Sequence, residues 1–178
     1  MFFVVGDKIP KIKFTYFNGR GLGEISRLIL AQAGVEFEDQ RLTPDEWKKL
    51  KSSKWIDDFT KIQNSIIISE IFLATPPPHQ VPLLDFDGFK ISQSITIARF
   101  LAKTYSLDGK SILEKAQADM IVDFMVEIKI KCRNNPNFKT EILPEAMKMF
   151  EKFLKSNGNN KFFVGNEVLH KYITLPCH

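Results

Sequence analysis

A tyrosine near the end of an alternating segment is the first residue that could do chemistry. Residues 11–17, KIKFTYF, alternate polar and apolar side chains as a β-strand does, and Tyr16 stands just before the glycine-containing loop NGRGLG. No CxxC motif accompanies this tyrosine, which argues against disulfide exchange. Taken alone, packing of the tyrosine ring under the next helix is the simpler interpretation.

Residues 79–94, HQVPLLDFDGFKISQS, end in side chains suited to an anion. Gln93 and Ser94 stand where a helix begins, and the unpaired N–H groups and dipole of a helix start favour negative charge. Ser94 or Ser92 can equally be a simple N-cap, and capping and binding are compatible. Earlier in the stretch Val81 precedes Pro82 just before a strand, where a proline is often cis.

Two other sets of side chains recur at helical spacing. Trp47 and Lys51 lie four residues apart in a short segment that opens with a capping-box pattern, TPDE. Taken alone, the tryptophan is a packing residue and the lysine a solvated one. Asp119, Asp123 and Glu127 also recur every four residues and form an acidic stripe, which in isolation indicates a solvated helix face.

The elements that must position these residues follow the order of a thioredoxin-like domain. Residues 11–42 show a strand, a helix ended by Gly34, and a second strand, the minimum for a parallel crossover. Residues 81–86 and 89–91 form strands around an Asp87-Gly88 hairpin turn, and a helix follows to Tyr105. We therefore predict an α/β thioredoxin-like domain over residues 11–105.

The remaining segments differ in character. Beyond the linker SLDGKS, residues 112–133 and 139–155 show helical patterns, so residues 111–178 are predicted to form an all-helical domain. Residues 52–78 have no clean period and end in a triple proline, where a compact domain would use a short connection. We interpret them as an insertion.

Composition narrows the possible roles. The 178 residues are 44% hydrophobic and carry a net charge of +4, but the basic residues are scattered, so a nucleic-acid partner is not expected. Two distant cysteines, Cys132 and Cys177, suit a reducing compartment. No targeting or membrane-spanning segment is evident, and we expect a cytoplasmic protein without a membrane partner.

Four motifs together resemble the sigma class of glutathione transferases, which includes glutathione-dependent prostaglandin D synthase and the S-crystallins. They are KFTYFNGRGLGEISRLIL, FEDQRLTPDEWKKLK, QVPLLDFDG and SQSITIARFLAKTYSLDG, and the similarity resumes at FFVGNEV. The resemblance implies a thioredoxin-like domain followed by an all-helical domain, here incomplete. It also implies glutathione as substrate or cofactor, a hydrophobic electrophile as second substrate, and a homodimer.

The resemblance also assigns roles to individual residues. It implies that the Tyr16 hydroxyl donates a hydrogen bond to the glutathione thiolate, the reactive form of the thiol. It implies that Val81 pairs with the cysteinyl backbone beside a cis Pro82, and that Gln93 and Ser94 hold the γ-glutamyl carboxylate. The residues expected at the glycyl carboxylate are Trp47, Lys51 and Gln80.

In the family, acidic groups on the first helix of the second domain reach the neighbouring subunit, which makes Asp123 and Glu127 possible partner-subunit contacts. The residue matching another family acid is Val126 in this chain, so no metal site is predicted.

Three departures from the family pattern favour an alternative. Leu22 replaces an arginine that helps polarise the tyrosine, the insertion separates Lys51 from Gln80, and the end LHKYITLPCH replaces an expected capping box. The alternative is a catalytically weak or inactive crystallin-like or ligand-binding relative, or a non-functional splice variant or gene-model product.

Overall fold

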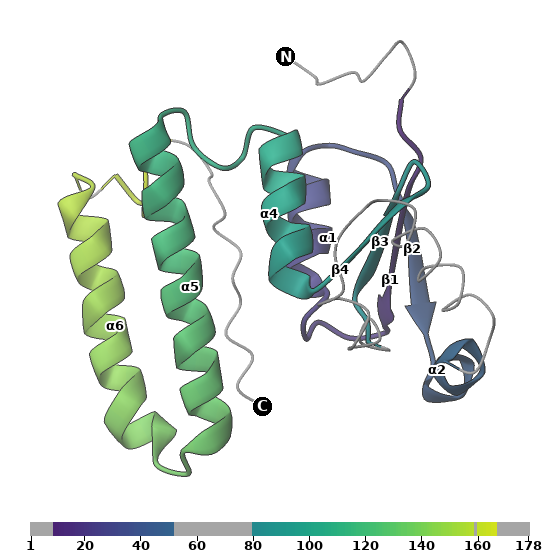
Figure 1. Ribbon diagram of the computed structural model, residues 1–178. Helices are drawn as coiled ribbons and strands as arrows, with labels where there is room; N and C mark the ends of the chain where they lie inside the picture. The colour runs from purple at the N-terminus through teal and green to yellow at the C-terminus, as the bar shows by residue number, and fades with distance from the viewer. Residues whose placement is uncertain (1–8, 52–79, 159, 167–178) are drawn as a thin grey trace, which may run out of the picture. The chain divides into compact units, whose positions relative to one another are not determined.

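The computed structural model describes residues 9–51, 80–158 and 160–166 (Figure 1). The predicted insertion, residues 52–78, lies outside the described residues. Within them the chain divides into two compact units. The sheet unit comprises residues 9–24, 35–51 and 80–97, and the helical unit comprises residues 25–34, 98–158 and 160–166. The boundaries predicted for the two domains stay predictions.

The sheet unit contains a mixed four-stranded sheet in the order β2-β1-β3-β4. The strands are β1 (Ile12–Phe17), β2 (Glu38–Leu42), β3 (Leu83–Phe86) and β4 (Phe89–Ser92). β1 and β2 are parallel, whereas β1 with β3 and β3 with β4 are antiparallel. This is the topology that the predicted strand-helix-strand unit and hairpin require.

Strand β1 departs from the alternation that its sequence shows. Phe14, Thr15 and Tyr16 are buried one after another, although their side chains alternate between the two faces of the strand. Thr15 tolerates burial because its hydroxyl donates a hydrogen bond of 3.0 Å to the side-chain oxygen of Gln40 on β2. A polar residue in a central strand can therefore be buried when a neighbouring strand supplies its partner.

The hairpin between β3 and β4 turns at Asp87 and Gly88, as the sequence predicts. Both residues have positive φ, 52° and 89°, which a two-residue turn matching the strand twist requires. The Asp85 carboxylate accepts the Gly88 N–H at 2.9 Å and closes the turn. Gly34 likewise has the positive φ expected after a helix, 65°.

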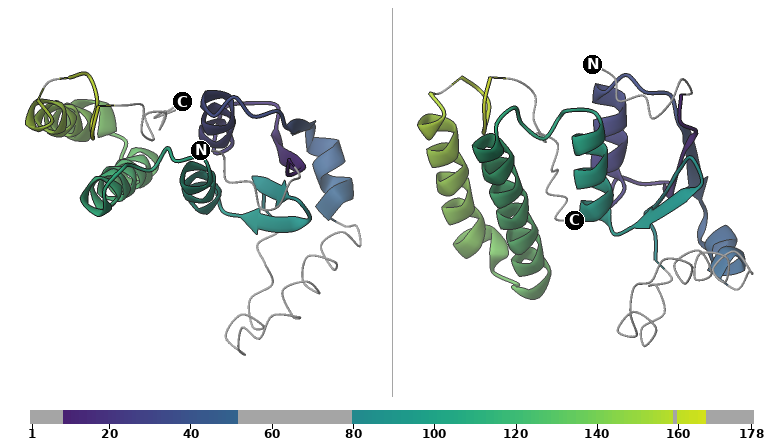
Figure 2. Two further views of the ribbon diagram at one scale, coloured as in Figure 1. Left: turned by 90° about the horizontal axis from the view of Figure 1, so that it is seen from above. Right: turned by 45° about the horizontal axis from the view of Figure 1, so that its top comes forward.

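The described helices are α1 (Glu24–Gln32), α2 (Pro44–Lys51), α4 (Ser94–Thr104), α5 (Ile112–Asn134) and α6 (Phe138–Ser156). α5 and α6 extend past their predicted limits by one residue at one or both ends. They run side by side as a helical hairpin (Figures 1 and 2). Their core contains Ile121, Met125, Ile128, Phe138, Ala146, Phe150 and Val164.

Candidate functional site

The strand register gathers the predicted site residues at one end of the sheet. Tyr16 lies opposite Arg41, near the C-terminal ends of β1 and β2. Because β3 runs against β1, Thr15 pairs with Leu83, the first residue of β3. Leu83 in turn pairs with Ser92, the last residue of β4. The end of β1, the end of β2, the start of β3 and the end of β4 therefore meet.

We call this region the strand-end site and define it by Tyr16, Trp47, Gln80–Pro82 and Gln93–Ser94, all within the sheet unit. β2 leads into α2, which carries the tryptophan, and β4 leads into the first turn of α4 (Figure 1). The chain thus brings four segments, separated by up to 78 positions in sequence numbering, to one end of four short strands.

Tyr16 is held by the loop that follows it. Its side chain is buried, and its hydroxyl oxygen accepts the backbone N–H of Leu22 at 3.0 Å. Gly21 and Gly23 lie against the phenol: a Cβ on Gly21 would stand 2.6 Å from the hydroxyl oxygen, and one on Gly23 2.5 Å from ring atom Cδ1. The loop is therefore shaped around this tyrosine.

An aromatic row connects Tyr16 to α2. The rings of Tyr16 and Phe17 have centroids 5.5 Å apart, and the Phe17 and Trp47 rings meet edge-on at 6.1 Å. Trp47 is half-buried, so both the packing role and the binding role proposed from its sequence are compatible with its position. Lys51 is the last residue of α2.

The capping box predicted for α2 is present. The Glu46 carboxylate accepts the Thr43 N–H at 2.7 Å, and Thr43 Oγ1 accepts the Glu46 N–H at 3.3 Å. Hydrogen bonds from the backbone and hydroxyl of Thr43 lower the pKa of the Glu46 carboxyl below its ordinary value. These bonds fix the start of the helix that carries Trp47.

The Val81-Pro82 peptide bond is cis, which confirms the prediction from the sequence. Val81 is buried, whereas the neighbouring Gln80 is exposed. Of the two residues expected at the helix start, Gln93 has a positive φ of 73°, and its carbonyl accepts the Ile97 N–H at 2.9 Å. Ser94 is the first residue of α4 and not its cap, so the capping alternative for Ser92 or Ser94 is wrong.

Gln93 is one of four non-glycine residues with a positive φ among the described residues, the others being Asp87, Ser106 and Lys161. A non-glycine residue rarely adopts φ near +70°, and such residues cluster at ligand sites, where the surrounding structure holds them. The first N–H groups of any helix lack partners within the helix. The start of α4 therefore presents an exposed Gln93 side chain beside donors suited to a carboxylate.

The acidic stripe on α5 lies in the helical unit and makes ion pairs within the chain. Arg99 of α4 donates to Asp119 at 2.8 Å and to Asp123 at 2.6 Å, and Glu127 pairs with Lys131 at 2.6 Å. Burial opposes the charge of Arg99, but the hydrogen bonds to Asp123 and Asp119 outweigh it and raise the arginine pKa. The role of Asp123 and Glu127 toward a partner subunit stays a prediction.

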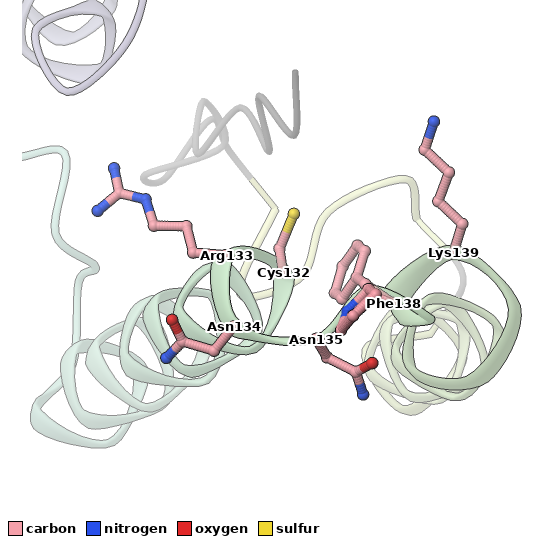
Figure 3. A pocket seen from close by; sticks show the side chains of 7 residues that line it. Cys132, Arg133, Asn134, Asn135, Phe138 and Lys139 are labelled. Atoms are coloured by element: carbon pink, nitrogen blue, oxygen red, sulfur yellow. The ribbon is translucent and has the colours of Figure 1, made fainter.

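A pocket at the turn between α5 and α6 is separate from these residues. It has a volume of about 530 Å³ and is lined by residues 132–136, Phe138 and Lys139 (Figure 3). None of the predicted site residues lines it. Cys132 is disulfide-bonded, which contradicts the expectation of reduced thiols at this position; Cys177 lies outside the described residues.

Comparison with known proteins decides the family. No family model matches the chain. The chain is 35% identical over 176 residues to "Glutathione S-transferase 1" of Ascaris suum, covering 90% of this chain and 74% of that protein. It is 36% identical over 173 residues to "Hematopoietic prostaglandin D synthase" of Gallus gallus, covering 90% and 73%. The chain belongs to the glutathione S-transferase family.

Solved structures of glutathione transferases agree with this assignment. A glutathione transferase of Caenorhabditis elegans is 32% identical, with a TM-score of 0.69 over 91% of this chain and 76% of that one. Monomeric glutathione transferase 3 of Necator americanus is 31% identical, with a TM-score of 0.70 over 90% and 75%. The predicted fold class is confirmed: a thioredoxin-like domain followed by a helical domain, in the glutathione transferase fold.

The relatives are named glutathione S-transferases, which agrees with the enzyme class that the resemblance implied. Membership of this family also implies glutathione as substrate. Among the described residues no three His, Cys, Asp or Glu side chains are grouped to hold a metal ion. Within the same residues no helix is both long enough and apolar enough to cross a membrane.

Sequence reasoning missed two features of this glutathione transferase. The first is the contact of Leu22 and the two loop glycines with Tyr16, for which the only signal was the glycine spacing in NGRGLG. The second is Arg99, whose partners Asp119 and Asp123 are one helical turn apart on the next helix. Both depend on side-chain geometry that no periodicity encodes.

Proposed function

We propose that the chain is a sigma-class glutathione transferase that binds glutathione at the strand-end site. The supporting observation is the strand register, which brings Tyr16 to the same end of the sheet as the start of β3 and the end of β4, the strand ends that adjoin Val81-Pro82 and Gln93-Ser94. Tyr16 lies beside the start of β3, where Val81 pairs with the cysteinyl unit. Gln93 and Ser94 hold the γ-glutamyl carboxylate, while Trp47, Lys51 and Gln80 hold the glycyl carboxylate.

The role of Tyr16 in this proposal is to stabilise negative charge on sulfur. A thiol is mostly protonated at neutral pH, and the thiolate is the nucleophile. The Tyr16 hydroxyl keeps its own proton and donates a hydrogen bond to the sulfur, while the thiol proton leaves to solvent. The sulfur electron pair then forms a bond to the electrophilic carbon, and the leaving group departs with its bonding electrons.

The proposal also covers the glutathione transferase class of the chain, its second substrate and its oligomeric state. Relatives named prostaglandin D synthase, from Gallus gallus and Mus musculus, support the sigma class and make glutathione-dependent isomerisation a second reaction to test. We further propose a hydrophobic electrophile, a cytoplasmic location and a homodimer. One solved relative is described as monomeric, so the oligomeric state needs its own measurement by analytical ultracentrifugation.

The test uses the full chain, purified without glutathione resin. Binding of glutathione is measured by calorimetry, and conjugation is measured with chlorodinitrobenzene, in which the C–S bond replaces the bond to chloride. Binding together with conjugation supports the proposal. Binding without turnover of this electrophile or of a prostaglandin endoperoxide identifies the non-catalytic alternative, and absence of binding overturns the proposed site.

A further inference from the structure

The chain contains two Asn-Gly pairs, Asn18-Gly19 after β1 and Asn157-Gly158 at the end of α6. In such a pair the backbone nitrogen of the glycine can attack the side-chain amide of the asparagine, because glycine has no Cβ to obstruct the approach. The product is a five-membered cyclic imide, which water opens to aspartate or isoaspartate. The two pairs have different surroundings, and the difference indicates which of them reacts.

The attacking nitrogens of the two pairs are comparable. The Gly19 N–H donates to the Phe17 carbonyl at 2.8 Å, and the Gly158 N–H donates to the Lys155 carbonyl at 3.2 Å. Each nitrogen therefore has to leave a backbone acceptor before it can react. Both glycines are exposed, and a Cβ on either would have nothing within 4 Å. Access to the backbone nitrogen alone does not separate the two pairs.

The side-chain carbonyl of Asn18 accepts a hydrogen bond from a cation. Arg41 of β2 donates from Nη1 to Asn18 Oδ1 at 3.0 Å, and its Nε donates to the Asp39 carboxylate at 2.8 Å. When a nitrogen attacks the amide carbon, negative charge develops on Oδ1. A donor already bound to that oxygen stabilises the developing charge, as in an oxyanion hole, and a charged donor does so more strongly than a neutral one.

Asn157 has the opposite arrangement. Its amide nitrogen Nδ2 lies 2.8 Å from the Gly165 carbonyl oxygen, 3.0 Å from that of Phe162 and 3.2 Å from Asn160 Oδ1. These hydrogen bonds hold the nitrogen that would have to leave. No donor reaches Asn157 Oδ1 from the part of the chain that the structure describes. Asn157 is also half-buried, whereas Asn18 is exposed to the water that would open the imide.

We propose that Asn18 is a site of spontaneous deamidation, in which Arg41 stabilises the transition state. The Gly19 nitrogen gives its hydrogen to a solvent base and forms a bond to Cγ of Asn18. The Cγ–Nδ2 bond then breaks, and the nitrogen leaves as ammonia with a proton taken from water. Water adds to one of the two imide carbonyls, the C–N bond there breaks, and the ring nitrogen regains a hydrogen. One amide and one water thus become one carboxyl group and one ammonia, without an oxidant or a reductant.

Deamidation changes the charge near the strand-end site, and its effect on binding rests on the proposed function. Asn18 follows Tyr16 by two positions, and Arg41 lies opposite Tyr16 in the register of β1 and β2. Asp39 already balances the charge of Arg41, so a carboxylate at position 18 adds net negative charge. Since glutathione carries two carboxylates, we expect its Kd to rise about twofold at low salt.

The main experiment times the deamidation of the full chain by mass spectrometry of its peptides, in the absence of glutathione. Native chain and chain unfolded in guanidinium chloride are kept in the same neutral buffer. In the native chain we expect Asn18 to react at least about tenfold faster than Asn157, whereas the two rates should be similar in the unfolded chain, where the local contacts are lost. Equal rates in the native chain, or reaction of Asn18 only after unfolding, overturn the proposal.

Three variants test the parts that Arg41 and Gly19 play. Arg41→Gln removes the charged donor and should slow deamidation of Asn18 about tenfold, with Asn157 unchanged. Arg20→Gln is the matched control, since Arg20 is exposed in the same loop and, within the described residues, its side chain makes no hydrogen bond with Asn18. Gly19→Ala should also slow the reaction, because its Cβ fits but hinders the nitrogen. An Arg41→Gln chain that reacts as fast as the wild type refutes the role of the arginine and with it the proposal.

A binding measurement separates the modification from the proposed function. Calorimetry compares the Kd for glutathione of the wild type with that of Asn18→Asp, which is the aspartate product, and of Asn134→Asp, which makes the same charge change at an exposed position of α5. Only Asn18→Asp should bind more weakly, by a difference that shrinks at high salt. Equal Kd values overturn the effect of the charge. If the wild type binds no glutathione, the proposed function fails, whereas the rates at Asn18 and Asn157 still decide whether the modification occurs.

Discussion

Arg99 of α4 donates its Nε hydrogen to Asp119 of α5 at 2.8 Å, and its Nη2 reaches Asp123 at 2.6 Å. The planar guanidinium can serve both carboxylates at once, since its donors point in fixed directions. One arginine therefore ties two successive helices together across the linker that joins them.

Replacing this arginine should weaken the link between α4 and α5. We expect Arg99→Ala to lower the free energy of unfolding by about 1 kcal/mol, a modest value because both carboxylates are more than one-third exposed. Arg99→Lys should lose nearly as much, because a single ammonium group cannot replace the planar fork.

Double-mutant cycles in urea, at low and high salt, check this link. Coupling should be larger to Asp119 than to Asp123, whose side chain is more exposed. Equal stability of Arg99→Ala and the wild type would show that the contact contributes nothing.

Removal of the Tyr16 hydroxyl should act on turnover more than on binding. We expect Tyr16→Phe to reduce kcat by about a hundredfold while the Kd for glutathione changes little, because the hydroxyl acts on the charge of the sulfur. Steady-state kinetics and calorimetry measure the two effects.

Tyr105→Phe is the matched control for this change. Its hydroxyl is buried without a hydrogen-bond partner among the described residues, and burial raises the pKa of Tyr105. Loss of the Tyr105 hydroxyl should leave kcat unchanged. Full activity of the Tyr16→Phe enzyme would falsify the assignment of this residue.

The start of α5 should contribute to stability in a pH-dependent way. Backbone hydrogen bonds from Ser111 and Lys110 lower the pKa of the Glu114 carboxyl from 4.5. Since the folded state has the lower pKa, the contribution is complete above pH 4.5 and disappears as the pH falls through the folded-state pKa.

Glu114→Gln therefore should be less stable than the wild type at neutral pH, with a difference that shrinks as the solution is acidified below pH 4.5. Thermal unfolding across this range provides the measurement. A difference that stays constant with pH would contradict the role given to the carboxylate charge.

The core of the α5–α6 hairpin should be sensitive at Phe150. Its ring is buried, with centroids 5.4 Å from Phe124 and 5.8 Å from Phe163. We expect Phe150→Ala to destabilise the chain by about 3–5 kcal/mol, through lost burial and a cavity. Met147→Ala, on the same helix but 45% exposed, should change stability by less than about 0.5 kcal/mol. Similar urea midpoints for the two variants would refute the assigned core.

The features predicted correctly from the sequence are those encoded by neighbouring residues. The Asp87-Gly88 turn, the Thr43 capping box and the cis bond at Pro82 each depend on residue types within four positions. Such local chemistry leaves few backbone alternatives, so the strands and helices around these residues could be placed from the order of the amino acids alone.

The features that the sequence did not reveal depend on contacts between distant segments. The burial of Thr15 requires Gln40, 25 positions away, and the pairing of Arg99 requires Asp119, 20 positions away. The sequence suggested weaker thiolate activation because Leu22 lacks a cationic side chain. In the structure Leu22 contacts Tyr16 through its backbone amide, which no side-chain pattern can display.

The Asp87-Gly88 turn lies at the opposite end of β3 from Leu83 and the strand-end site, and both turn residues are exposed. A fluorophore or affinity peptide attached there would therefore project away from Tyr16, with a four-residue strand between label and site. Because the Asp87 N–H donates to the Lys11 carbonyl at 2.8 Å, attachment through the side chain of position 87 keeps the bond that anchors the turn to the chain entering β1. The hairpin thus offers a built-in handle for immobilising the protein or following ligand binding without obstructing the site.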